Sequence, residues 1–168
     1  MPVQNSSTSS ASSTPHSLSQ DEYHISTIDY RYHEGVIEFL RRFFFRDEPL
    51  NVSVRLLDQD TSTCPELEEY SVKTMKDGMS VMATSSFGQI IGVCLNGIIR
   101  RRNDGEKEDE SSNPKFCKII KFLQYIEKES DVFGKYPEIS KILCVKILSV
   151  DRAWRGRGIA KELMDKTR

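Results

Sequence analysis

The residues best suited to chemistry lie near the end of the 168-residue chain, at 147–160. A β-branched apolar run there leads into a turn that contains Gly156 and Gly158, and a helical pattern begins at once behind the turn. A strand, a glycine-containing turn and a helix start together present backbone N–H groups to an anion. Arg155 and Arg157 can add charge-assisted hydrogen bonds. The pattern therefore predicts a phosphate or pyrophosphate site.

Two familiar phosphate-binding motifs do not fit this turn. A P-loop needs Gly-Lys-Ser/Thr after the turn, and Ile159-Ala160 stands there instead. A dinucleotide fingerprint needs a third small residue at the right spacing, which is missing. An Arg/Gly turn that binds no ligand remains the alternative at this point.

A second candidate is the acidic pair Asp47-Glu48, which stands before Pro49. The residue before a proline is biased out of the helical region, so the pair is expected in a turn at the end of a helix. A carboxylate acts best as a general base when burial or a like charge raises its pKa toward ~6–7. The neighbours of Glu48 are an acid and the aromatic residues at 43–45. Ordinary solvated turn acids are the alternative reading.

Bulk properties exclude several classes of function. A net charge of −1 favours neither nucleic acid nor an anionic membrane, and no apolar run approaches the ~20 residues that a membrane span needs. The N-terminus lacks the features of a secretory signal. The four cysteines are widely spaced and the three histidines form no metal-binding pattern. We expect a cytoplasmic monomer with reduced cysteines and no protein-bound metal.

The rest of the chain divides into a tail and one α/β domain. Residues 1–20 are rich in Ser and Thr and are expected to be disordered, because they cannot bury enough apolar surface. Asp29 is expected to cap the first helix, and the fully apolar strand at 89–99 is expected to be central. The patterns predict a largely antiparallel sheet with strands at 23–28, 80–84, 89–99 and 142–150, and helices behind Asp29, Thr63 and Pro114.

The charged segment at 100–113 is expected to be a solvated loop. Its Arg100-Arg101-Arg102 run could form a phosphate patch, but the nearby acids favour a loop that neutralises its own charge.

Several segments resemble one protein family. Arg155, Gly158 and Ala160 match the acetyl-CoA motif of the GCN5-related N-acetyltransferase (GNAT) superfamily, Arg/Gln-x-x-Gly-x-Gly/Ala after a strand. Similarity to the insect arylalkylamine (dopamine) N-acetyltransferases extends over about residues 22–168, and the Asp-Glu-Pro-Leu-Asn segment is its most specific part. The matching segments lie at 43–51, 92–97, 113–116 (Asn113-Pro114-Lys115-Phe116) and 146–150.

The resemblance implies a GNAT acyl-CoA N-acyltransferase fold, with a mixed, mostly antiparallel sheet flanked by helices. It implies acetyl transfer from acetyl-CoA, the co-substrate, to the primary amine of dopamine, serotonin, tyramine, octopamine or tryptamine, without a metal. Glu48 would be the general base. The backbone at Leu148, Ser149 and Val150 would pair with the pantetheine amides, and the loop of Arg155, Gly156, Arg157, Gly158, Ile159 and Ala160 would hold the pyrophosphate.

The pattern stops mid-helix, so we expect residues 21–168 to be the N-terminal part of a single N-acetyltransferase domain, incomplete at its C-terminus. Two alternatives stay open. The chain could be an inactive or partly folded CoA-binding fragment, or an acetyltransferase for polyamines or protein N-termini.

Overall fold

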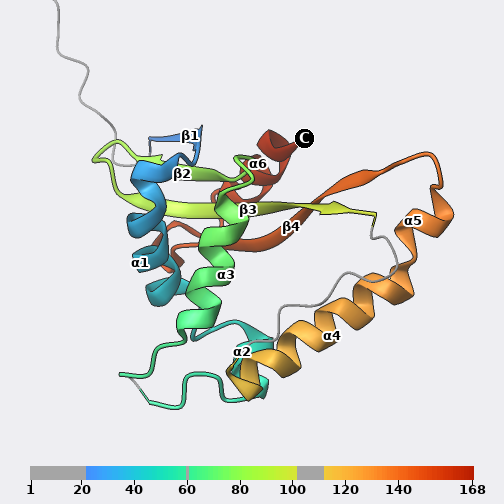
Figure 1. The fold of residues 1–168 in the computed structure, drawn as a ribbon. Helices are drawn as coiled ribbons and strands as arrows, with labels where there is room; N and C mark the ends of the chain where they lie inside the picture. Colours follow the sequence, from blue (N-terminus) through green and yellow to red (C-terminus); the bar gives the residue numbers. More distant parts are fainter. Residues whose placement is uncertain (1–21, 60, 102–111) are drawn as a thin grey trace, which may run out of the picture.

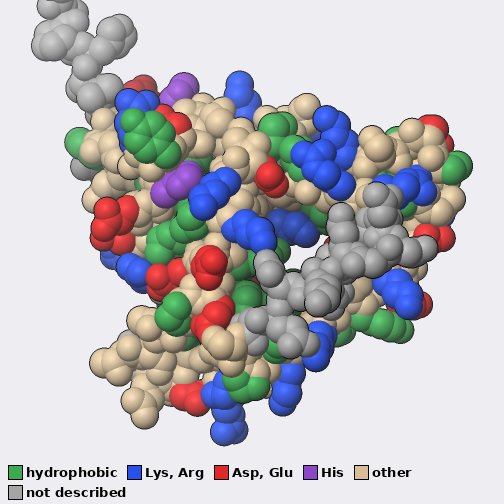
Figure 2. Space-filling model, in the orientation of Figure 1, with side chains coloured by type: hydrophobic (Ala, Val, Ile, Leu, Met, Phe, Trp, Pro, Cys, Tyr) green, Lys and Arg blue, Asp and Glu red, His purple; other side chains and the backbone are tan. Residues whose placement is uncertain are grey.

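The computed structural model describes residues 22–59, 61–101 and 112–168 of the chain. The tail at 1–20 and Arg102 of the arginine run lie outside these residues. Among the described helices, none is both long and apolar enough to cross a membrane. Figure 2 shows Lys and Arg side chains interspersed with Asp and Glu on one face of the molecule.

A four-stranded antiparallel sheet forms the centre of the fold (Figure 1). Its strands are β1 (Tyr23–Thr27), β2 (Val81–Ser85), β3 (Ile90–Arg100) and β4 (Lys141–Val150), and they lie in that order. The predicted hairpin at 80–99 is confirmed as β2 and β3. Strand β3 lies between two neighbours and is buried from Ile91 to Gly97, as its continuous apolar run predicted. Among the described residues, β4 pairs only with β3, so its other edge is open.

The helices at Pro65 and Pro114 begin where the sequence predicted, and a further short helix begins at Pro49, which was expected only to end the preceding helix. Pro49, Pro65 and Pro114 each occupy the first turn of a helix, where the missing N–H costs nothing. Asp29 caps a 3₁₀ turn, η1, and the first α-helix follows it at His33, one turn later than expected. The helical elements are η1 (Tyr30–Tyr32), α1 (His33–Phe43), α2 (Pro49–Ser53), α3 (Pro65–Met75), α4 (Pro114–Ser130), α5 (Val132–Lys135), η2 (Arg152–Trp154) and α6 (Ile159–Thr167).

Each face of the sheet carries its own hydrophobic core. Successive residues of β2 point to opposite faces, so Met82 belongs to one core and Val81 and Ala83 to the other. Helices α1 and α3 pack on the first face, against Met82, Val93 and neighbouring residues. Helix α6 packs on the second face through Ile159 and Leu163. The sheet is thus covered on both sides, and α6 is the element that continues from the predicted anion-binding turn.

The second half of α4 is less buried than its apolar stripe predicted. Phe116 and Ile119 are buried, but Leu123 and Ile126 are 41% and 49% exposed. The reason is geometric, because the start of α4 lies beside α2 and α3, whereas the rest of α4 extends away from these two helices toward α5 (Figure 1). Hydrophobic side chains are correspondingly visible at the surface along α4 (Figure 2).

Candidate active site

The loop between β4 and α6 has the geometry of an anion-binding turn. Gly156 and Gly158 have φ angles of 80° and 84°, in the left-handed region that favours glycine. Gly158 is the N-cap residue of α6 and offers no side-chain hydrogen bond to the first turn. A Cβ atom added at either glycine would meet nothing within 4 Å, so the loop faces open space. The first N–H groups of α6 and the helix dipole are therefore placed to receive a phosphate group.

Hydrogen bonds shape the start of this loop. The Asp151 carboxylate accepts a bond from the backbone N–H of Ala153 at 2.9 Å, and the Asp151 N–H donates to the carbonyl of Ile91 on β3. The Arg155 Nε donates to the carbonyl of Val150 at 3.0 Å. These bonds fix the backbone just before the glycines, and they tie it to the central strand.

Close packing fixes α6 against the sheet. A Cβ atom at Gly92 on β3 would lie 3.2 Å from side-chain carbons of both Ile159 and Leu163. Both of these side chains are fully buried. The glycine lets α6 approach the sheet closely, so the N-terminus of the helix is held rigidly beside the end of β4.

The predicted cofactor-binding residues of β4 are its last three residues, in the part of the strand that pairs with β3. Val93 pairs with Ser149 and Cys94 with Leu148, which places both at the β3 side of the ladder. Ser149 is buried and Leu148 is 37% exposed. The β3–β4 register shifts between Leu95 and Asn96, where β4 carries one extra residue. Such a bulge bends the strand and increases its twist.

Glu48 lies in the turn between α1 and α2, as predicted. Its carboxylate accepts a hydrogen bond from the backbone N–H of Asn51 at 2.8 Å, so Glu48 is the N-cap of α2. The side chain of Asn51 is buried and donates to the carbonyl of Phe45 at 3.0 Å. The Asp-Glu-Pro-Leu-Asn segment is therefore a self-supporting turn: one side chain caps the helix and another closes the turn behind it.

Asp47 connects this turn to the anion-binding loop. Its carboxylate forms an ion pair with the guanidinium of Arg152, which lies in η2 between β4 and α6. The two partners are 105 positions apart in the sequence. The structure thus brings the two candidate segments together, a pairing that neither local pattern predicted. Because Arg152 neutralises Asp47, the like charge that the sequence placed beside Glu48 is offset.

A cavity of about 580 Å³ lies next to α2, between that helix and the loop that follows it. Sequence patterns gave no sign of it, because its walls come from a segment without regular periodicity. The lining residues combine apolar and charged side chains: Phe45, Arg46, Asn51, Val52, Arg55, Leu57 and Asp58.

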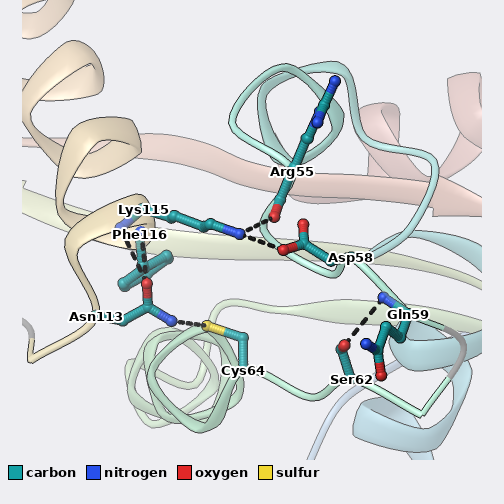
Figure 3. Close-up of polar contacts among 8 residues, drawn as sticks. All are labelled: Arg55, Asp58, Gln59, Ser62, Cys64, Asn113, Lys115 and Phe116. Carbon is teal, nitrogen blue, oxygen red and sulfur yellow. Dashed lines mark hydrogen bonds and ion pairs between the residues drawn. The ribbon is translucent and has the colours of Figure 1, made fainter.

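The start of α4 pins the wall of this cavity (Figure 3). The Lys115 ammonium donates to the carbonyl of Arg55 at 2.7 Å and contacts the Asp58 carboxylate at 2.6 Å. The Asn113 side chain caps the first turn of α4 and also donates to the Sγ of Cys64. The Asn113-Pro114-Lys115-Phe116 segment therefore holds Arg55, Asp58 and Cys64 in place.

Two other groups of candidate residues have structural roles. Arg101 donates to the backbone carbonyls of Phe133 and Ile139, among others, so its guanidinium clamps the loop before β4. Burial raises the pKa of the Cys64 and Cys94 thiols, which keeps them protonated and poorly nucleophilic near neutral pH. Among the described residues, no group of three or more His, Cys, Asp or Glu side chains is placed to hold a metal ion.

Comparison with known proteins agrees with this geometry. No protein-family model matches the sequence. Arylalkylamine N-acetyltransferase 2 from Aedes aegypti is 40% identical and superposes with a TM-score of 0.79, over 86% of this chain and 68% of that enzyme. A mosquito arylalkylamine N-acetyltransferase-like protein, 5b, is 25% identical with a TM-score of 0.74, over 87% of this chain and 69% of its own.

The fold extends to a more distant acetyltransferase. The polyamine N-acetyltransferase of Drosophila melanogaster is 20% identical with a TM-score of 0.68, over 87% of this chain and 68% of that enzyme. The fold class implied by the acetyl-CoA motif is thereby confirmed, and with it an acyltransferase architecture. The chain belongs to the insect arylalkylamine N-acetyltransferases, within the GNAT superfamily.

Proposed function

We propose that this protein transfers the acetyl group of acetyl-CoA to the primary amine of an arylalkylamine, such as dopamine, serotonin, tyramine, octopamine or tryptamine. The observation that carries the proposal is the 40% identity to an arylalkylamine N-acetyltransferase over 86% of this chain. The uncapped N-terminus of α6 and its two left-handed glycines support it, because they suit the pyrophosphate of CoA.

The cofactor site would extend from the edge of β4 into α6. The backbone at Leu148, Ser149 and Val150 lies on the strand whose second edge is open in the described structure, which suits pairing with the pantetheine amides. The pyrophosphate would lie in the loop built from Arg155, Gly156, Arg157, Gly158, Ile159 and Ala160. Bound acetyl-CoA would supply the acetyl group as a thioester.

Glu48 would remove the proton from the substrate ammonium. An alkylammonium resembles Lys, with a pKa near 10.4, so freeing the amine at pH 7 costs roughly 4–5 kcal/mol. Glu48 accepts that proton directly or through water, and the free amine attacks the thioester carbonyl carbon. The C–N bond forms as the C–S bond breaks, the nitrogen loses its second proton, and the departing thiolate takes up a proton in turn to give CoA. The Asp47–Arg152 ion pair supports this assignment, because it ties the turn of Glu48 to the cofactor loop.

The cavity beside α2 is the candidate site for the aromatic end of the amine. Phe45, Val52 and Leu57 supply apolar lining, and the cavity adjoins the helix that Glu48 caps. A volume of about 580 Å³ lies within the range of small-molecule sites.

A polyamine substrate is the second candidate. The chain shares its fold with a Drosophila enzyme that forms N-acetylagmatine, and the Asp58 carboxylate in the cavity wall could attract a second cationic group. The contact between Asp58 and Lys115 weighs against it, because the carboxylate already has a cationic partner.

The test is a thiol-release assay with the chain, acetyl-CoA and a panel of tryptamine, dopamine, agmatine and spermidine. We expect kcat/KM to be higher for the two arylalkylamines. A preference for agmatine or spermidine would favour the polyamine function. If calorimetry shows that CoA binds but no amine in the panel causes thiol release from acetyl-CoA, only a binding function would remain.

A further inference from the structure

The guanidinium of Arg157 is stacked on an aromatic ring in the cofactor loop. Its central carbon lies 4.7 Å from the centre of the Trp154 ring. A cation over the face of an indole is attracted by the ring's quadrupole. Arg157 itself stands between Gly156 and Gly158, the two left-handed glycines of the turn.

Trp154 is fixed from several sides. Its ring meets that of Tyr23 edge-on, with centroids 6.5 Å apart and planes at 87°. The Tyr23 hydroxyl donates to the carboxylate of Glu162 on α6 at 2.7 Å, which ties β1 to the same helix. The Trp154 side chain also packs against the core under α6, and its backbone N–H donates to the carbonyl of Asp151. These contacts hold the Trp154 ring in place beside the turn that contains Gly156 and Gly158.

The two arginines of the loop are held in different ways. Arg155 is anchored by its bond to the carbonyl of Val150. Arg157 is exposed, and its guanidinium lies over the Trp154 ring. An exposed Arg loses considerable rotamer entropy when it binds an anion. A ring that already holds the guanidinium reduces that loss on binding.

We propose that Trp154 is a positioning residue of the cofactor loop, which holds the Arg157 guanidinium ready for a phosphate group of CoA. This inference rests on the proposed function, because CoA supplies the anion. Trp154 does not touch the ligand in this account; it acts through Arg157. Removing the ring should weaken CoA binding by about two- to five-fold, the usual strength of an exposed cation–π contact.

The test is a double-mutant cycle on the full chain, with CoA affinity measured by calorimetry. Trp154→Leu removes the ring and keeps apolar bulk, Trp154→Phe keeps a ring, and Arg157→Gln removes the cation. We expect Trp154→Leu to lose two- to five-fold, Trp154→Phe to retain most of the affinity, and Trp154→Leu/Arg157→Gln to bind no worse than Arg157→Gln. As a matched control, Arg42→Gln breaks a similar contact on α1, over Phe43 at 4.9 Å, and should leave CoA affinity unchanged.

Fluorescence gives a second readout, because Trp154 is the single tryptophan of the chain. Its emission should change during a CoA titration with the midpoint that calorimetry gives, and the change should be smaller in Arg157→Gln. Two results would overturn the role of Trp154 and leave the proposed function standing. One is a loss of CoA affinity in the double variant that equals the product of the two single losses. The other is unchanged tryptophan emission during saturable binding of CoA. No calorimetric binding of CoA by the unmodified chain would overturn both.

Discussion

The double role of Glu48 leads to a sharp prediction. Its carboxylate caps α2 through the N–H of Asn51, and we propose it as the general base. Glu48→Gln keeps an oxygen that can accept the capping bond but removes the basic group. Glu48→Ala removes both. The two variants should therefore differ in stability and resemble each other in catalytic loss.

The expected magnitudes follow from these two roles. Loss of an N-cap side chain costs about 1 kcal/mol, which lowers Tm by roughly 2–4 °C in a protein of this size. Glu48→Gln should stay close to the unmodified protein in Tm. Loss of a general base typically lowers the rate by about 10²–10⁴-fold. At pH 7 roughly one amine in 2,500 is unprotonated, and that fraction rises about tenfold for each pH unit.

The assay is the pH dependence of kcat/KM between pH 7 and 9.5, with thermal unfolding measured on the same samples. The deficit of Glu48→Gln should be largest at pH 7 and should shrink as the amine loses its proton in solution. Glu129→Gln removes a charge at an exposed position on α4 and should change neither quantity. An equal loss at every pH would remove Glu48 from the role of base. A Tm of Glu48→Gln as low as that of Glu48→Ala would contradict the capping argument.

Three further predictions concern other parts of the structure. The side chains of Asp47 and Arg152 are 40% and 67% exposed, so Asp47→Asn should lower the free energy of unfolding by at most about 1 kcal/mol. The same variant should raise KM for acetyl-CoA up to about five-fold in steady-state kinetics. The exchanged pair Asp47→Arg/Arg152→Asp should bring KM most of the way back. Burial raises the pKa of Tyr70 to about 12, so above pH 10 the folded state keeps a proton that the unfolded chain releases. The contribution of Tyr70 to stability is complete below about pH 10, and the free energy of unfolding in urea should fall by roughly 2–3 kcal/mol as pH rises toward 12. Tyr70→Phe should reduce this fall, and absence of the fall in the unmodified protein would contradict the burial argument. Gly158→Ala places a side chain at a φ of 84° and should lower both the free energy of unfolding and the free energy of CoA binding by about 1–2 kcal/mol. Gly35→Ala, within α1 and with its nearest contact at 3.4 Å, should lower neither.

Local chemistry made much of the fold predictable. Prolines at 65 and 114 mark helix starts because a missing N–H is harmless in the first turn. The apolar run of β3 signalled a central strand because both of its faces are covered. The Arg155–Ala160 spacing indicated an anion-binding turn because only glycine takes the required φ angles easily.

The parts that were not predictable depend on contacts between distant residues. Nothing near Asp47 indicates that its partner is Arg152, because that contact exists only after β4 returns alongside the sheet. The exposed end of α4 carries the same apolar stripe as the buried end, so periodicity could not separate them. The Trp154–Arg157 contact lies within one loop, and an aromatic residue three positions before an arginine was the signal that could have revealed it.

The order of the strands has a consequence for how the site is assembled. Strands β1 to β4 lie in the sheet in the order in which they leave the ribosome. Each strand can therefore pair with one that is already in place, and domains generally form from the N-terminal side during synthesis. The turn of Glu48 forms early, whereas the anion-binding loop between β4 and α6 forms only after β4 has paired with β3 and α6 has packed against Gly92. The proposed CoA site therefore forms after the turn of Glu48, and CoA added during refolding should stabilise the docking of β4 and α6 and no earlier step.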